Sequence, residues 1–288
     1  MSLDFFLIPA CIIAILLLFN RENKIYRQTP RENNEVNSAW MCDSGRMHYH
    51  TLEAKRRLTD PMIKSGKSHQ VIDWPTAILK ATRGLSKFSG EEIAIIGSAG
   101  MTNEELFLLK TLSSTLNAGI VDVVKVEGEG DEYLSHKDKR PNTNGAKAIL
   151  KLRSPGSKIN TIKKRIKDGE IKALLVYGEN VIKYGIDQET LKNLKFLVCS
   201  HIQANSLAEF SNVILPGSGY AEKRGSMINA TGRLQVLNKA IEPPGQSRED
   251  WEILQDLNRS LDGKAVSYTH LRAHETGRNL VCRHLLEK

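Results

Sequence analysis

The sequence has little cysteine, and its cysteines are not spaced as pairs. Only four occur in 288 residues, and they lie far apart: Cys11, Cys42, Cys199 and Cys282. This spacing argues against a scaffold held by disulfides and fits a reducing cytoplasm. The apolar content of 40% is enough for a core, and the length allows one large or two ordinary domains. The composition therefore predicts a globular protein.

The basic part of the sequence lacks aromatic residues. The net charge is +8, and the excess is concentrated in residues 158–172, where Lys163, Lys164, Arg165 and Lys167 lie on a predicted helix. No aromatic residue lies among them to stack on bases. Elsewhere, basic residues are mixed with acids. We interpret the stretch as a solvated helix face and expect no nucleic-acid partner.

No apolar run has the length of an ordinary membrane-spanning helix. The longest, residues 5–19, has fifteen residues, whereas a spanning helix needs about 20. No basic residue precedes it, as one would in a signal peptide. An anchor here is the alternative that would make the chain a membrane-tethered α/β binding module.

Residues 211–257 carry the densest pattern in the chain. An apolar run at residues 213–215 is cut by Pro216 and Gly217, as at the end of a buried strand. A polar, glycine-containing loop is predicted next. Ser247 is predicted to cap the helix that follows, with residues 249–251 in its first turn.

The order of the polar residues in this stretch resembles the molybdopterin oxidoreductase superfamily. The matching residues are Leu215, Pro216, Glu222, Gly225, Asn229, Gly232, Arg233, Asp250 and Trp251. The resemblance implies a pterin-pocket-like loop, vestigial in this chain, formed by Glu222, Gly225, Asn229, Gly232 and Arg233. The alternative is an ordinary connection whose glycines only make turns.

Residues 24–46 resemble the iron-sulfur segment of the same superfamily, and especially that of the large peripheral-arm subunit of respiratory NADH:quinone oxidoreductase, complex I. The resemblance implies that Cys42 occupies the position of the fourth ligand of a 4Fe-4S cluster. The three preceding cysteines of the family are absent, and one thiolate cannot hold such a cluster. We therefore expect no cluster in this chain and a buried, inert Cys42.

The region after the strand predicted at residues 121–126 determines the expected chemistry. Catalytic members of the superfamily carry a cysteine or selenocysteine metal ligand there, and this sequence has none. We therefore expect no bound molybdopterin and no catalytic residue. His136 and Asp138, near Asp131, are interpreted as solvated loop residues because no nucleophile accompanies them.

Strands alternate with helices along most of the chain. This order predicts an α/β fold with a doubly wound, mostly parallel sheet of the molybdopterin oxidoreductase type, beside a small iron-sulfur-type segment. Loops 178–180 and 200–205 are expected to meet at the carboxyl ends of the strands. The predicted strands are residues 92–96, 121–126, 171–177, 196–200 and 213–215, and helices are expected at 74–87, 102–116 and 187–194.

Both ends of the sequence differ from the family. Residues 1–19 read as a frameshift or false start, and residues 266–288 as an adapter-derived tail. In that tail, the alternative of a zinc site rests on a set of four residues, but a His-Glu-x-x-His motif is absent. The four residues are His270, His274, Cys282 and His284.

The sequence thus predicts four segments: an apolar run (1–19), an iron-sulfur remnant (20–50), a molybdopterin oxidoreductase-like domain (51–262) and a tail (263–288). The resemblance implies a fragment of the large peripheral-arm subunit of complex I, inactive alone, with the other peripheral-arm subunits as partners and no small-molecule substrate of its own. Its implied location is the cytoplasmic face of the bacterial inner membrane. The alternative is a catalytic, formate dehydrogenase-like oxidoreductase that binds a pterin dinucleotide through residues 222–235.

Overall fold

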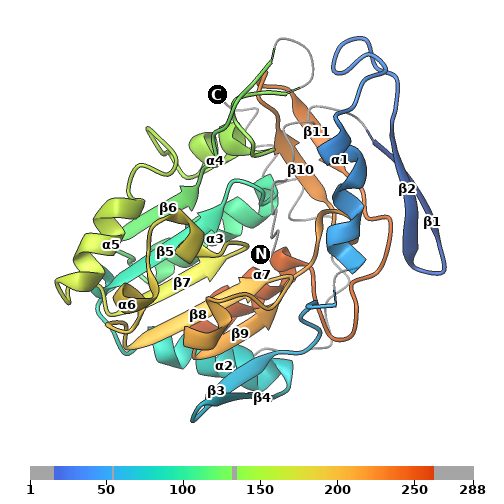
Figure 1. Ribbon diagram of the computed structural model, residues 1–288. Coiled ribbons are helices and arrows are strands. Elements are labelled where there is room, and N and C mark those ends of the chain that lie inside the picture. The colour runs from blue at the N-terminus through green and yellow to red at the C-terminus, as the bar shows by residue number, and fades with distance from the viewer. Residues whose placement is uncertain (1–15, 54, 132–134, 263–288) are drawn as a thin grey trace.

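A seven-stranded sheet forms the centre of the molecule in a computed structural model that describes residues 16–53, 55–131 and 135–262 (Figure 1). The strand order is β4-β3-β9-β8-β7-β5-β6. An antiparallel hairpin, β3 (Met62–Ser65) and β4 (Ser68–Val71), extends the sheet beyond β9. The other strands are parallel: β5 (Ile93–Ser98), β6 (Ile120–Val124), β7 (Ala173–Tyr177), β8 (Phe196–His201) and β9 (Val213–Pro216).

Helices cover both faces of this sheet, as predicted for a doubly wound fold. One core lies under α2 (Trp74–Leu85), α3 (Asn103–Thr115), α4 (Thr143–Ile149) and α7 (Asp250–Leu261). The opposite core lies under α5 (Ile159–Lys167) and α6 (Gln188–Leu191). Burial on both faces explains why the central strands are continuous apolar runs rather than alternating ones.

Local sequence explains the start of α2 and the buried face of α3. The Asp73 carboxylate accepts a hydrogen bond from the Thr76 amide at 2.9 Å and caps α2. On α3, Leu106, Leu109 and Leu112 are fully buried. Cys199 is also buried, in β8, and burial raises the pKa of its thiol to about 12.

Three local predictions are wrong. Glu249, not Ser247, is the N-cap residue of α7, because the Ser247 hydroxyl donates to the Leu58 carbonyl at 2.8 Å. The segment before α2, where no strand was predicted, contains the β3–β4 hairpin. The loop expected after β9 contains a second hairpin, β10 (Gly225–Ile228) paired with β11 (Leu234–Leu237).

The N-terminal segment lies beside this second hairpin (Figure 1). It contains an antiparallel hairpin, β1 (Leu16–Arg21) and β2 (Lys24–Pro30), and a short helix, α1 (Asp43–Met47). Residues 1–15 of the apolar run and the tail from residue 263 lie outside the described residues. Within the described part, no helix is long and apolar enough to cross a membrane.

The short 3-10 helices are η2 (His48–Glu53), η3 (Gly90–Glu92), η4 (Val181–Tyr184), η5 (Ala208–Phe210) and η6 (Tyr220–Glu222).

Candidate functional site

The strand order reverses between β5 and β7, and this creates a crevice at their carboxyl ends. From β5 the chain continues to β6 on one side, whereas β7, β8 and β9 follow one another on the other side. Open α/β sheets bind ligands at such a switch point. In this chain Ser98 ends β5 and Glu179 follows β7, and the Ser98 hydroxyl donates to Glu179 Oε1 at 2.5 Å. The crevice is therefore bridged by the chain's own side chains.

Arg140 completes the bridge. Its Nη2 lies 2.7 Å from Glu179 Oε2 and donates to the Tyr184 hydroxyl at 3.1 Å. The Arg140 and Glu179 side chains are only 5% and 3% exposed, so the pair is shielded from water. Burial raises the pKa of Glu179, and the Arg140 charge opposes that rise. The switch point therefore holds a buried, internally compensated ion pair.

A cavity of about 790 Å³ lies over the ends of β5, β7, β8 and β9. The predicted loops 178–180 and 200–205 both contribute to its walls, as expected for a parallel sheet. His48 and His201 also line it. Burial, together with the Arg140 charge, lowers the pKa of each to about 4, so both rings are neutral at pH 7.

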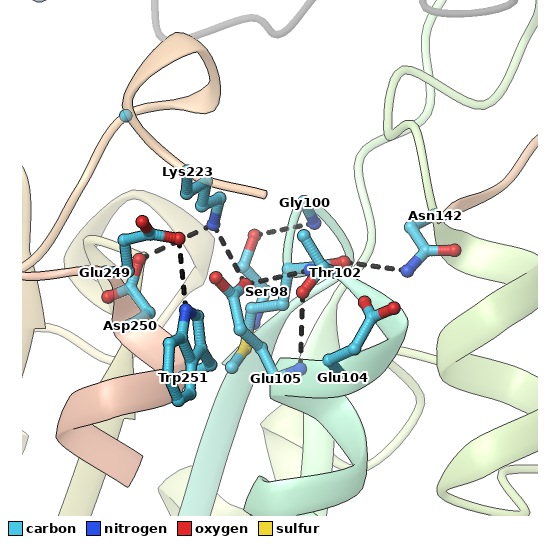
Figure 2. Close-up of polar contacts among 12 residues, drawn as sticks. Ser98, Gly100, Thr102, Glu104, Glu105, Asn142, Lys223, Glu249, Asp250 and Trp251 are labelled. Atoms are coloured by element: carbon cyan, nitrogen blue, oxygen red, sulfur yellow. Dashed lines mark hydrogen bonds and ion pairs between the residues drawn. The ribbon is translucent and has the colours of Figure 1, made fainter. Parts of the chain in front are cut away.

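A buried cluster of three charged residues lies at the edge of this cavity. Figure 2 shows Lys223 reaching from the segment after η6 toward Asp250 on α7 and Glu105 on α3. Lys223 Nζ lies 2.9 Å from Glu105 Oε2 and 3.5 Å from Asp250 Oδ2. Glu105 Oε2 also accepts from the Thr102 amide at 2.8 Å, in the capping box of α3. Lys223 thus ties two helices to the chain leaving the sheet.

The charges of this cluster shift each other's protonation. Burial raises the pKa of Glu105 to about 7, with Asp250 adding to the rise and Lys223 opposing it. Burial also raises the pKa of Asp250. The two carboxylates outweigh the effect of burial on Lys223 and raise its pKa, so the amine stays protonated.

The first residue of the predicted pterin-pocket-like loop is part of another ion pair. The Glu222 carboxylate accepts from Arg57 Nη1 and Nη2 at 2.8 and 2.6 Å, and from the Gly219 amide at 2.7 Å. The Arg57 and Glu222 side chains are 7% and 2% exposed. Glu222 therefore fastens η6 to the chain before β3 and does not line the 790 Å³ cavity.

The other four residues of that loop build the β10–β11 hairpin. Gly225 lies so close to α3 that a Cβ atom there would be 2.7 Å from Thr102 Cβ. The Asn229 side chain accepts from the Arg233 amide at 2.8 Å and closes the turn, in which Gly232 has a φ of +87°. The Arg233 guanidinium pairs with Glu35 of the N-terminal segment.

Cys42 is partly exposed rather than buried, contrary to the expectation from sequence. It is the N-cap residue of α1, and its Sγ accepts from the Gly45 amide at 3.4 Å. In the described part of the chain, no group of three or more histidine, cysteine, aspartate or glutamate residues is arranged to hold a metal ion.

The geometry of the pterin-pocket-like loop does not fit a pterin. None of its five residues lines the cavity, and the space beside Gly225 is filled by the chain's own Thr102 and Glu104. The described cavity walls also contain no cysteine to bind a metal. The Glu222 carboxylate, the Asn229 side-chain oxygen and the Arg233 guanidinium are paired within the protein, whereas Asn229 Nδ2 is buried without a hydrogen-bond partner.

The residues whose interactions organise the site were not predicted from the sequence. Glu179 lies in the predicted loop 178–180 and Arg140 lies shortly before α4, but neither was predicted as a site residue. Lys223 is next to a motif residue, and Glu105 forms the capping box of α3. The available signal in the sequence was the position of Lys223 directly after the motif residue Glu222.

Part of the chain matches a known protein family. Residues 141–260 match the molybdopterin oxidoreductase family. The chain is 39% identical over 95 residues to the F420-dependent formate dehydrogenase subunit alpha of Methanocaldococcus jannaschii, an alignment that covers 32% of this chain and 14% of that protein. It is 36% identical over 110 residues to the mitochondrial NADH-ubiquinone oxidoreductase 78 kDa subunit of Candida albicans, covering 36% of this chain and 15% of that protein.

A solved structure supports the same fold. Acetylene hydratase from Pelobacter acetylenicus superimposes with a TM-score of 0.67 at 9% sequence identity, over 89% of this chain and 69% of that one. The alignments span only about one-seventh of the length of the two curated relatives. The sequence match of residues 141–260 to the molybdopterin oxidoreductase family agrees with the doubly wound sheet and with this structural likeness.

Proposed function

We propose that this chain is a cofactor-free scaffold domain from the large peripheral-arm subunit of a complex I-type NADH:quinone oxidoreductase. The observation that carries the proposal is the internal pairing of the buried charges at the site. Glu222 is paired with Arg57, Glu179 with Arg140, and Lys223 with two carboxylates. Such pairs stabilise the packing of loops, and the paired groups are not available to a cofactor.

The N-terminal segment supports a complex I origin. Residues 24–46 resemble the cluster-bearing segment of the large peripheral-arm subunit, and the 78 kDa subunit of Candida albicans is among the relatives. In this proposal residues 20–50 are a remnant of that segment, with Cys42 at one ligand position, and residues 51–262 are the scaffold. We further propose a place on the cytoplasmic face of the bacterial inner membrane, with no redox activity in the isolated chain.

The test is assembly with the other peripheral-arm subunits. The chain is co-expressed with those subunits from the same source and purified through a tag on one of them, and the complex is weighed by native mass spectrometry. We expect one copy of the chain per complex. A matched preparation contains the Glu222→Gln variant, which lacks one charge of the buried pair and is expected to assemble in lower yield. If the wild-type chain is folded but never found in the complex, the proposal is wrong.

The second candidate function is catalytic, as a formate dehydrogenase-like oxidoreductase. The identity of 39% to a formate dehydrogenase subunit and the 790 Å³ cavity at the carboxyl ends of the strands favour it. In this alternative a pterin dinucleotide would supply the redox chemistry when bound. Stoichiometric molybdenum in the purified chain would distinguish this function from the scaffold.

A further inference from the structure

A basic surface lies at the β6 edge of the central sheet. Residues 139–167 contain ten basic residues and no acidic one. In this stretch α4 packs on one face of the sheet and α5 on the other, so the chain between them passes around the edge strand β6 (Figure 1). We call the following exposed residues the basic edge: Lys147, Lys151, Arg153, Lys164 and Lys167.

The charges of the basic edge are not compensated within the described chain. The acids near α5 are paired with two other basic residues: Lys163 with Asp187 at 2.8 Å, and Arg165 with Glu91 and Glu170 at 3.6 and 2.7 Å. Within the described part of the chain, no residue of the basic edge forms an ion pair. Their positive charge is therefore available to a partner.

The loop before α5 is fastened over the edge strand. The fully buried Asp122 of β6 accepts hydrogen bonds from the Gly156 and Lys158 amides at 2.9 and 2.7 Å. It also accepts from the amide of its neighbour Val123 at 2.8 Å. A covered edge is protected from the addition of a further strand. A partner at this edge therefore meets side-chain charges rather than open backbone groups.

The chemistry of this surface favours an acidic polypeptide over a membrane or a nucleic acid. The large apolar residues that are exposed in the described chain all lie outside residues 139–167, so this stretch presents none to insert into a bilayer. It also contains no aromatic residue to stack on bases. Because the surface bends around the sheet, a flat membrane reaches only part of it, whereas an extended chain can follow it.

We propose that the basic edge binds an extended segment of a partner protein that is rich in aspartate and glutamate. The carboxylates of the segment pair with side chains on α4, on the loop that passes β6 and on α5. Salt weakens such binding, because the pairs are exposed. This inference goes beyond the scaffold function and does not depend on it, because the basic edge belongs to the chain itself.

The test is fluorescence anisotropy of a labelled peptide of alternating glutamate and serine, titrated with the full chain. We expect a Kd below about 100 µM at about 50 mM salt. At about 200 mM salt, binding is expected to be at least about tenfold weaker. If the peptide does not reach this affinity at the lower salt concentration, the proposal is overturned.

A quadruple variant locates the binding surface. Its substitutions are Lys147→Gln, Lys151→Gln, Lys164→Gln and Lys167→Gln. It is expected to bind the peptide at least about tenfold more weakly than the wild type, and the matched control less than about threefold. The control removes the same charge at exposed positions outside the basic edge, with Lys55→Gln, Lys67→Gln, Lys80→Gln and Lys87→Gln. Equal losses in the two variants would overturn the proposal, because only the total charge would then matter.

Carbodiimide crosslinking of the peptide to the wild-type chain locates the contact without any variant. We expect crosslinks at Lys151 and Lys164, and crosslinks found only outside the basic edge would overturn the proposal. The thermal midpoint of the quadruple variant should stay within about 2 °C of the wild type, because exposed lysines contribute little to stability.

The competing partners are tested at the same salt concentration. Vesicles of phosphatidylserine and phosphatidylcholine represent a membrane, and a labelled DNA oligonucleotide represents a nucleic acid. We expect both to bind more weakly than the peptide. Tighter binding of either one, lost in the quadruple variant and kept in its control, would overturn the choice of an acidic polypeptide.

Discussion

Replacing Lys223 with methionine removes the cation that lies between two buried carboxylates. Methionine has a similar volume and no charge, so the substitution leaves packing largely intact. Lys223 is 7% exposed in its side chain, and Glu105 is fully buried. Above pH 7, where Glu105 is ionised, removing its cationic partner leaves an uncompensated buried charge and costs about 3–5 kcal/mol.

This cost predicts a large fall in the thermal midpoint. For a domain of this size, 1 kcal/mol corresponds to about 2–4 °C, so Lys223→Met is expected to lower the midpoint by about 6–20 °C. The free energy of unfolding is measured by urea titration, followed by tryptophan fluorescence. At about pH 5 the loss is expected to be smaller, because the carboxyl groups become protonated.

The matched control is Lys192→Met. Lys192 pairs with Glu189 at 2.6 Å, but these side chains are 58% and 80% exposed. An exposed pair of this kind contributes about 0–1 kcal/mol. If Lys223→Met is no more destabilising than Lys192→Met, the buried cluster does not hold the helices together as described.

Three further predictions concern other parts of the site. The pKa of Glu105 is about 7 in the folded protein and 4.5 ordinarily, so its contribution to stability is full below pH 4.5 and is lost, by about 3 kcal/mol, as the pH rises through 7. Glu105→Gln should remove this pH-dependent loss, as measured by urea titrations at about pH 5 and pH 8. If the difference between the two pH values is the same in the variant, the raised pKa of Glu105 is contradicted. Glu222→Gln should lower the free energy of unfolding by about 3 kcal/mol, because it breaks a buried ion pair. Glu35→Gln breaks an exposed pair and should cost under about 1 kcal/mol. Equal costs would contradict a stabilising role of the buried Arg57–Glu222 pair. Gly225→Ala should lower the free energy of unfolding by at least about 2 kcal/mol, because the added methyl group would collide with Thr102 and Glu104. Gly66→Ala, where no atom lies near the added methyl group, should cost about 1 kcal/mol. Equal costs of the two substitutions, measured by calorimetry, would contradict the close packing at Gly225.

Local chemistry explains which elements could be predicted from the sequence. The Asp73 cap and the leucines of α3 depend on neighbours within a few residues, and such patterns can be read directly. The β10–β11 hairpin could not be predicted in this way. Leu234 and Val236 share one face of β11 and are exposed, so this face is not buried against a core, and backbone pairing forms the hairpin. Ser247 failed as a cap because its hydroxyl binds Leu58, which is 189 residues away.

The same distinction applies to the site. The motif residue Glu222 was found by its place in a pattern, but its partner Arg57 is 165 residues away. Lys223 and Glu105 are 118 residues apart. Long-range pairing of this kind is set by the topology of the sheet, and a single sequence does not reveal it. The location of loops 178–180 and 200–205 was predictable, because parallel strands place their carboxyl ends together.

The most direct test of the central claim is the molar ratio of molybdenum to protein, measured by mass spectrometry on the full chain expressed with cofactor biosynthesis intact. A catalytic relative produced in the same cells serves as the positive control. The account predicts no molybdenum above the background of the buffer, because Glu222 and Arg233 of the loop are paired with Arg57 and Glu35 within the protein. One molybdenum per chain would contradict it.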